Sequence, residues 1–384
     1  MSSLAWLDTS PEDERRMREI VKLFSDTGTL DDLGIGQVRD ALGDLLFPGT
    51  STVHARARYF LLVPWAFQKA AAKHIGTSVR TKANLIERST IETLRNPVPE
   101  AGMIGAQAGK AIQTLPSSLY WAALGRYGIL ADPKALTWNV PIPAPAGFPY
   151  TIDEGLSLTS TEAEWLKERI VMAVPDSYLA YLLTDGLLAD PYEFDAPWDH
   201  PTLVTAPRKF QDQIEHARLF SLAINGAALI YNQLIATKYD ALPDSEDGYS
   251  DFYSERIEAW VTEMEAPRNE KAFENWDRHA FWQTVAKGRT LGRPVAPGTR
   301  LFINNWIDIV QANGARAVAT DNQVRRAITD RERQNKGSQS RLQNERQLKN
   351  WGGSSGSNRL IYRWPNVQVL LADIREGIAD ATAG

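Results

Sequence analysis

The residues best suited to bind a charged ligand lie near the C-terminus. Between Arg316 and Arg363 the chain has 11 Lys or Arg residues and 4 Asp or Glu residues, so this segment carries a local net charge of +7. Lys and Arg bind phosphate through charge, and Arg adds bidentate geometry. We therefore predict that DNA or RNA contacts this segment through Arg325, Arg326, Arg331, Arg333, Lys336, Arg341, Arg346 and Lys349.

The same segment contains a glycine–serine turn, in which the backbone N–H groups of Gly353 and Gly356 could approach an anion. Two other interpretations of the segment stay open. Because the formal net charge of the whole chain is −5, the rest of it carries about −12, and a solvated basic helix face could simply neutralise that charge. The segment could also bind a partner protein.

A second possible anion site lies where a glycine and three hydroxyl residues precede an expected helix. Thr50 and Ser51 stand before the helix start, and Arg56 and Arg58 follow closely. The phosphate-loop pattern is incomplete, because it requires a second Gly followed by Lys and Ser or Thr. Helix capping by Thr50 or Ser51 explains the hydroxyl groups without any ligand. The two arginines are two positions apart and point to different faces, so one of them could be buried in a structural ion pair.

No complete catalytic or metal-binding motif is present. The absence of cysteine excludes thiolate catalysis, Cys-ligated zinc and iron–sulfur clusters. None of the five histidines has a known ligand spacing. We assign no catalytic residue, no metal ligand and no cofactor. The sequence favours a protein that is not an enzyme. One acidic, proline-rich loop is either a solvated loop or a site for a divalent ion, with Asp190, Glu193, Asp195, Asp199 and His200 as possible ligands.

The elements that carry these residues are expected to be helices. Ser10 is a good N-cap for a first helix, in which Met17, Ile20, Val21 and Phe24 form an amphipathic stripe. Few segments alternate with the period of a strand. We therefore predict a mainly α, multi-helix globular protein with a basic C-terminal segment. Further helices are expected over residues 36–46, from near 50–52 to 64–65 or just beyond, and over 85–94, 116–124, 162–173, 177–184, 209–237, 253–265, 270–285 and 299–312, with one more near the C-terminus.

Proline spacing suggests a division of the chain. Residues 141–150 have Pro at alternate positions, which favours extended backbone and predicts a connector. We expect an N-terminal helical region over 1–140, a central helical region over 151–312, and a basic region with a terminal helix over 313–384. No basic start followed by an apolar run is present, and no apolar stretch reaches about 18 residues. A cytoplasmic protein without membrane contact is expected.

Several segments together resemble a known family. They include Leu45–Thr52, Pro116–Trp121, Glu215–Phe220, Trp351–Gly353 and Tyr362–Pro365. The set resembles an uncharacterised bacterial family, a domain of unknown function whose members are often encoded near restriction and anti-phage defence genes. The resemblance covers nearly the full chain and implies a role in defence. It brings no established active site.

These observations lead to three hypotheses. The first is a non-catalytic component of a bacterial anti-phage defence system that contacts nucleic acid or a nucleic-acid-processing partner protein. The second is a metal-dependent, nuclease-like hydrolase whose site is assembled from dispersed carboxylates. The third is a pure protein scaffold, in which the long apolar helix over residues 209–237 could lie in a subunit interface instead of a monomer core. Other defence-system proteins are possible partners.

Overall fold

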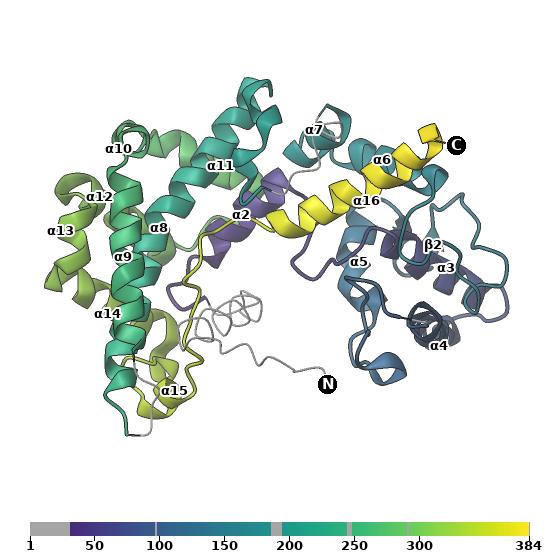
Figure 1. Ribbon diagram of the computed structural model, residues 1–384, viewed down its shortest axis with the longest axis horizontal. Helices are drawn as coiled ribbons and strands as arrows, with labels where there is room; N and C mark the ends of the chain where they lie inside the picture. Colours follow the sequence, from purple (N-terminus) through teal and green to yellow (C-terminus); the bar gives the residue numbers. More distant parts are fainter. Residues whose placement is uncertain (1–30, 97, 186–193, 244–247, 290–291, 384) are drawn as a thin grey trace, which may run out of the picture. The chain divides into compact units, whose positions relative to one another are not determined.

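The computed structural model describes residues 31–383, apart from 97, 186–193, 244–247 and 290–291 (Figure 1). The described residues form helices and one two-stranded antiparallel sheet, which confirms the mainly α prediction. The helix predicted after Ser10 lies outside the described residues. The chain divides into two compact units. The first contains the described residues up to Ala41 and Glu215–Leu360, and the second contains Leu42–Ile214 and Ile361–Gly384.

The first unit is built around helix α8 (Arg208–Asp240), most of which belongs to it. Two tryptophans anchor other helices to α8, because Trp260 Nε1 donates to the Leu222 carbonyl at 2.9 Å and Trp306 Nε1 donates to that of Ala223 at 2.8 Å. The other helices are α9 (Tyr249–Glu265), α10 (Pro267–Glu274), α11 (Arg278–Gly288), α12 (Pro297–Asn313), α13 (Ala315–Thr320), α14 (Asn322–Lys336), η5 (Gly337–Gln339) and α15 (Glu345–Lys349), with the first part of α2 (Gly36–Leu46).

Helix α8 is long and apolar enough to cross a membrane by length and composition, but 89% of its most apolar window is buried inside the protein. A core helix of a soluble protein has this character, because its apolar side chains are covered by neighbouring helices. Asn232 of α8 also holds a later segment of the chain. Its side-chain amide donates a hydrogen bond to the Ser355 carbonyl and accepts one from Ser355 N.

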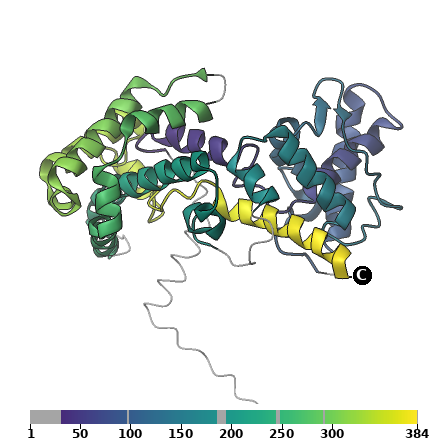
Figure 2. The same cartoon turned by 90° about the horizontal axis from the view of Figure 1, so that it is seen from above.

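The second unit contains two helix pairs and the small sheet. Helix α16 (Trp364–Ala383), yellow in Figure 2, packs along α6 (Ser160–Ala173). A Cβ atom at Gly377 would lie 2.8 Å from Ala163 Cβ, so glycine is what permits this close approach. The second pair is α3 (Tyr59–Ala71) and α4 (Thr77–Leu94). The remaining elements are the end of α2, η1 (Gly109–Ala111), α5 (Pro116–Arg126), β1 (Leu130–Asp132), β2 (Thr137–Trp138), α7 (Tyr178–Thr184), η2 (Pro197–Asp199) and η3 (Pro201–Val204).

The structure corrects the start of the helix expected from near residues 50–52 to 64–65 or just beyond. Helix α3 begins at Tyr59, because side chains from elsewhere take the preceding backbone N–H groups: Tyr120 Oη accepts from Ala55 N and Asp373 Oδ2 accepts from Ala57 N. Pro64 lies inside the helix, which continues to Ala71. Burial of nearly all its side chains outweighs the missing N–H of this proline.

Other helix boundaries also differ from the predictions. Helix α4 begins at Thr77 instead of near residue 85. The single helix expected over residues 270–285 is two helices, α10 and α11, and Asp277 caps the second by accepting from Ala280 N at 2.9 Å. Helix α6 begins at Ser160, two residues before the expected start, and is capped by Thr159 in a reciprocal capping box with Glu162. Residues 141–150 lie within the second unit, where the Ile142 carbonyl accepts from Trp65 Nε1.

Candidate polyanion-binding surfaces

Three of the predicted nucleic-acid-binding cations in the C-terminal segment contact the protein's own buried groups. Asp32 is 3% exposed, and its carboxylate lies 2.7 Å from Lys336 Nζ and 2.8 Å from Arg341 Nη1. Arg331 is also buried and donates to the Leu33 carbonyl at 2.8 Å. Buried carboxylates require such partners because an isolated charge is costly away from water. These three cations therefore stabilise the first unit.

A second buried carboxylate explains how the chain folds after α14. Glu332 is fully buried and accepts hydrogen bonds from Tyr231 Oη at 2.9 Å, from Ser340 Oγ at 2.5 Å and from the Arg341 backbone N–H at 2.6 Å. Burial, with Asp32 and Glu332 nearby, raises the pKa of Tyr231. The turn that follows α14 therefore folds around Glu332, an acidic residue within the basic segment.

The other five predicted cations differ in their exposure. Arg325 is half-buried and donates to Gln233 and to the Ala319 carbonyl. The exposed cations are Arg326, Arg333, Arg346 and Lys349. Two of these form exposed pairs on their own helices, Arg333 with Asp330 and Lys349 with Glu345. Such pairs contribute only about 0–1 kcal/mol and can exchange for phosphate. Nucleic-acid binding by this segment stays a prediction, and its exposed part is half neutralised by neighbouring acids.

The glycine–serine turn is held by side chains of α8 and α9. Asn232 pairs with the backbone of Ser355, and Tyr253 Oη donates to the Gly353 carbonyl at 2.7 Å. Arg256 Nη1 donates to Ser357 Oγ at 2.8 Å. These contacts give the turn a structural role within the first unit.

The second predicted anion site, formed by Thr50, Ser51, Arg56 and Arg58, is likewise occupied by protein groups. Arg58 is 1% exposed, with its guanidinium 3.0 Å from Glu162 Oε1. Arg56 Nε lies 2.9 Å from Asp373 Oδ1. Thr50 Oγ1 donates to the Phe47 carbonyl, and Ser51 Oγ accepts weakly from Val53 N at 3.5 Å. Both arginines are therefore in structural ion pairs, and phosphate binding here stays a prediction.

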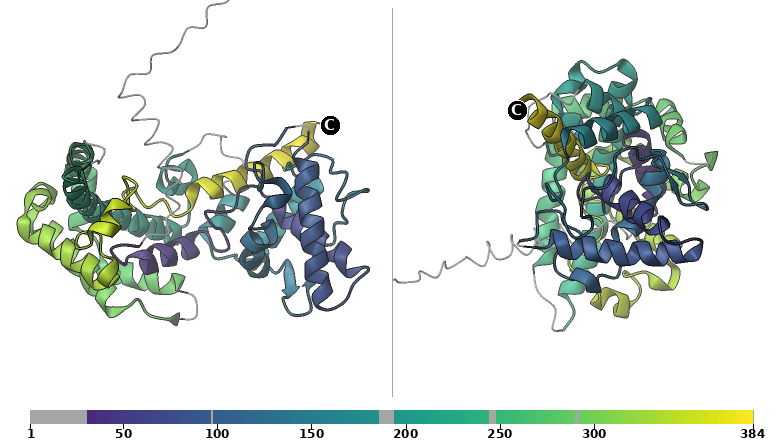
Figure 3. Two further views of the ribbon diagram at one scale, coloured as in Figure 1. Left: turned by 90° about the horizontal axis from the view of Figure 1, so that it is seen from below. Right: turned by 90° about the vertical axis from the view of Figure 1, so that its right-hand side faces the viewer.

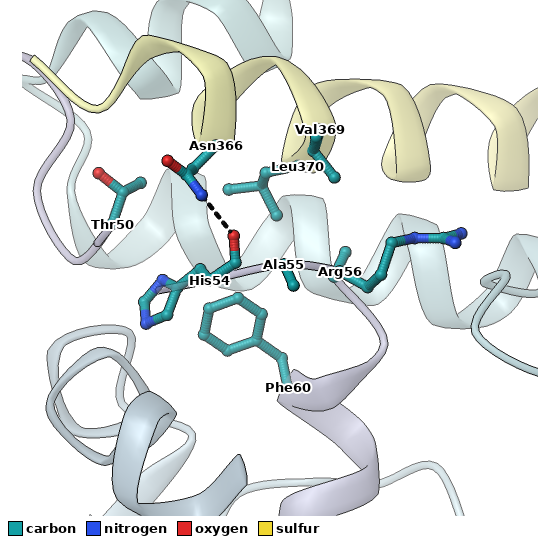
Figure 4. Close-up of a pocket in the computed structure, with 9 residues that line it drawn as sticks. Thr50, His54, Ala55, Arg56, Phe60, Asn366, Val369 and Leu370 are labelled. Carbon is teal, nitrogen blue, oxygen red and sulfur yellow. Dashed lines mark hydrogen bonds between the residues drawn. The ribbon is translucent and has the colours of Figure 1, made fainter. Parts of the chain in front are cut away.

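A small crevice lies beside these residues (Figure 4). Its free volume of about 10 Å³ is roughly the room that one water requires. Burial lowers the pKa of His54 to about 4, against the opposing effect of its hydrogen bond to the Leu119 carbonyl, so the ring is neutral at pH 7. His54 also stacks on Tyr120 at 4.3 Å between ring centroids. The crevice is too small for a substrate.

The structure shows four other exposed cations on and beside α3 and α4. Lys69 is exposed in the last turn of α3, Lys73 is exposed just after this helix, and Arg80 and Lys82 are exposed in the first half of α4. Among the described residues none of these four forms an ion pair. Helix α4 is the long blue helix at the margin of this unit in the left view of Figure 3. We call these four residues the α3–α4 surface.

The cause of this surface is visible in the sequence. No Asp or Glu occurs between Asp44 and Glu87, and Glu87 itself is 3% exposed. The fraction of Lys and Arg in this stretch is ordinary, because α3 consists mainly of apolar residues. The signal is the long absence of acidic residues, which leaves the cations without local partners.

An aromatic cluster supports one end of the α3–α4 surface. The Arg80 guanidinium lies 4.6 Å from the ring centroid of Trp121 on α5. The ring centroid of Phe67 lies 5.5 Å from that of Trp121 and 5.3 Å from that of Trp138. Trp121 and Trp138 are both half-buried. The surface therefore combines exposed charge with partly exposed aromatic rings.

The described residues of the predicted acidic loop do not form a metal centre. Asp190 and Glu193 lie outside the described residues. Asp195 and Asp199 are exposed, whereas His200 is buried between the rings of Phe194 and Trp364 and bonds Thr202 Oγ1 at 2.7 Å. Within the described part of the chain, no three His, Asp or Glu side chains are grouped to hold an ion.

The fold and these surfaces define a class of protein: a helical protein of two units whose described residues present a cationic surface without a metal cluster. The chain belongs to a family of unknown function (DUF6361), whose sequence profile matches residues 1–141 and 132–378. No curated protein and no solved structure matches it significantly.

Proposed function

We propose that this protein is a cytoplasmic, non-catalytic component of a bacterial anti-phage defence system that contacts nucleic acid. The defence context rests on the family resemblance described above. The nucleic-acid contact rests on one observation, the α3–α4 surface, whose four exposed cations have no ion-pair partner in the described part of the chain. Polyphosphate backbones bind such surfaces because each neutralised phosphate releases a counterion.

The strength of this contact follows from the number of cations. Four phosphate contacts predict that log K falls with log salt concentration with a slope of about −3 to −4. Raising the salt from about 50 to 200 mM should weaken binding by roughly 100-fold. The protein as a whole is acidic, so the contact is local and the long-range attraction is small.

The test is binding of fluorescently labelled DNA and RNA to the full-length protein and to the triple variant Lys69→Gln, Lys73→Gln, Lys82→Gln. We expect the triple variant to bind at least about 10-fold more weakly at low salt. Lys69 and Lys73 also lie near the C-terminus of α3, where cations stabilise the helix, so a thermal melt must show that the variant is folded.

Three results would contradict the proposal. Equal affinity of the folded triple variant and the wild type would remove the α3–α4 surface from any binding role. Cleavage of the probe when Mg²⁺ or Mn²⁺ is added would replace the non-catalytic role with the hydrolase alternative. If the wild type binds neither DNA nor RNA, the scaffold hypothesis takes its place.

A further inference from the structure

In the α3–α4 surface, the Arg80 side chain stacks on aromatic rings. Binding of phosphate by charge alone would not require this arrangement. Arg80 is exposed, and its guanidinium lies over the face of Trp121 at 4.6 Å and near the face of Phe67 at 6.0 Å. A cation over an indole face is attracted by the ring's quadrupole. Arg80 forms no hydrogen bond or ion pair with any described residue, so its N–H groups remain free to bind a ligand.

The layer has a rigid base. Phe67 is buried, and the rings of Trp121 and Trp138 meet edge to face at 5.9 Å. Helices α3 and α5 and strand β2 each supply one of these rings, so the platform is built by three elements of the second unit. Holding the guanidinium on this base reduces the entropy that Arg80 would lose on binding a ligand.

We propose that the ligand of the α3–α4 surface is single-stranded nucleic acid, with an unpaired base stacked at the Arg80–Trp121 layer and the adjacent phosphates on Lys69, Lys73 and Lys82. This inference rests on the proposed function. Unpaired bases stack on arginine planes and aromatic rings, and each stacked base contributes substantially to affinity. A duplex offers no free base faces, so it can use only the lysines and the charge of Arg80.

A lipid surface is the competing ligand for exposed cations. Ile75, 88% exposed in the loop between α3 and α4, and Leu85, 53% exposed on α4, are apolar residues that a membrane could bury there. Two separate aliphatic side chains give little apolar area, whereas a helix that lies in a bilayer interface presents a whole apolar face. The aromatic layer at Arg80 favours nucleic acid.

The experiment measures fluorescence anisotropy of the full-length protein with a labelled oligothymidylate and with a blunt DNA duplex that has the same number of phosphates. Arg80→Lys retains the charge but removes the planar group that stacks. We expect Arg80→Lys to weaken binding of the single strand about 10-fold and binding of the duplex less than about 2-fold, because stacking is worth roughly a factor of ten or more per base. The control Ile75→Ser should change neither affinity.

The outcomes separate this inference from the proposed function. If Lys69→Gln with Lys73→Gln weakens both probes but Arg80→Lys weakens them equally or not at all, the single-strand inference fails and the proposed function stands. If the lysine variant affects neither probe, both fail. Binding of the wild type to anionic phosphatidylglycerol vesicles that is lost in Ile75→Ser would overturn the inference in favour of a lipid surface. A selective loss of single-strand binding in Arg80→Lys supports it.

Discussion

At the scale of single residues, buried carboxylates decide which charges are available for binding. Asp32, Glu162, Glu332 and Asp373 each have cationic or N–H partners that were candidates for phosphate binding from the sequence. The sequence shows which residues are charged but not which are buried, so Arg331 and Arg326 cannot be distinguished from the sequence alone. Only the fold shows that the first is buried and the second is exposed.

This division predicts that substitution of a buried cation changes the stability of the protein but not its affinity for nucleic acid. Arg341→Ala removes one partner of the buried Asp32 carboxylate and should lower the free energy of unfolding by roughly 2–4 kcal/mol. Nucleic-acid affinity of the folded variant should stay unchanged. Denaturant unfolding and the oligonucleotide binding assay measure the two effects. Weaker binding by a variant of normal stability would instead assign Arg341 to the binding surface.

Glu87 predicts a pH dependence of stability. Its carboxylate accepts from Ser117 N at 2.7 Å and from Ser117 Oγ at 2.8 Å, and burial raises its pKa to about 7 despite these bonds and the nearby Arg88. Because the pKa is higher in the folded than in the unfolded protein, the neutral acid stabilises the fold at low pH. That contribution is lost as the pH rises from about 4.5 through about 7.

Glu87→Gln should remove this pH dependence. Glutamine can accept from Ser117 N and donate to Ser117 Oγ while staying neutral. We expect the variant to be more stable than the wild type by about 3 kcal/mol at pH 8 and by less than about 1 kcal/mol at pH 5. Urea unfolding at both values measures this. A loss of stability at pH 8 would show that the ionised carboxylate is the favoured form.

At the scale of elements, close helix contacts depend on small residues. A Cβ atom at Gly226 of α8 would lie 2.2 Å from a ring carbon of Trp260 on α9. Gly226→Ala should therefore destabilise the first unit by about 1–3 kcal/mol, although alanine favours helix formation. The matched control is Gly125→Ala on α5, where nothing lies within 4 Å of the added Cβ. Thermal melts of both variants test the contrast, and equal midpoints would argue against the close approach.

Helical periodicity predicted most elements but not all boundaries. Stripes and caps located α2, α7 and α12 closely, because those signals are local. The start of α3 was missed because it depends on Tyr120 and Asp373, which are distant in the sequence. The same limit applies to the candidate site, since the Arg80–Trp121 contact joins two helices that no local pattern connects.

At the scale of the whole molecule, the chain is acidic, so a polyanion must be bound by local groups of cations. The excess of Lys and Arg after Arg316 suggested one nucleic-acid-binding segment. In the structure, that segment neutralises buried acids and retains Arg326, Arg333, Arg346 and Lys349 at its surface. The α3–α4 surface has fewer cations, but no acidic residue occurs in its stretch of chain. Binding to a polyanion should therefore depend mainly on the second unit.

The most direct measurement is the salt dependence of nucleic-acid binding for the wild type and two variants. One variant changes Lys69, Lys73 and Lys82 to Gln, and the other changes Arg326, Arg333, Arg346 and Lys349 to Gln. We predict that the first variant reduces the slope of log K against log salt by about 2–3 and that the second reduces it by less than about 1. The reverse order would place the contact in the C-terminal segment and contradict the role proposed for α3 and α4.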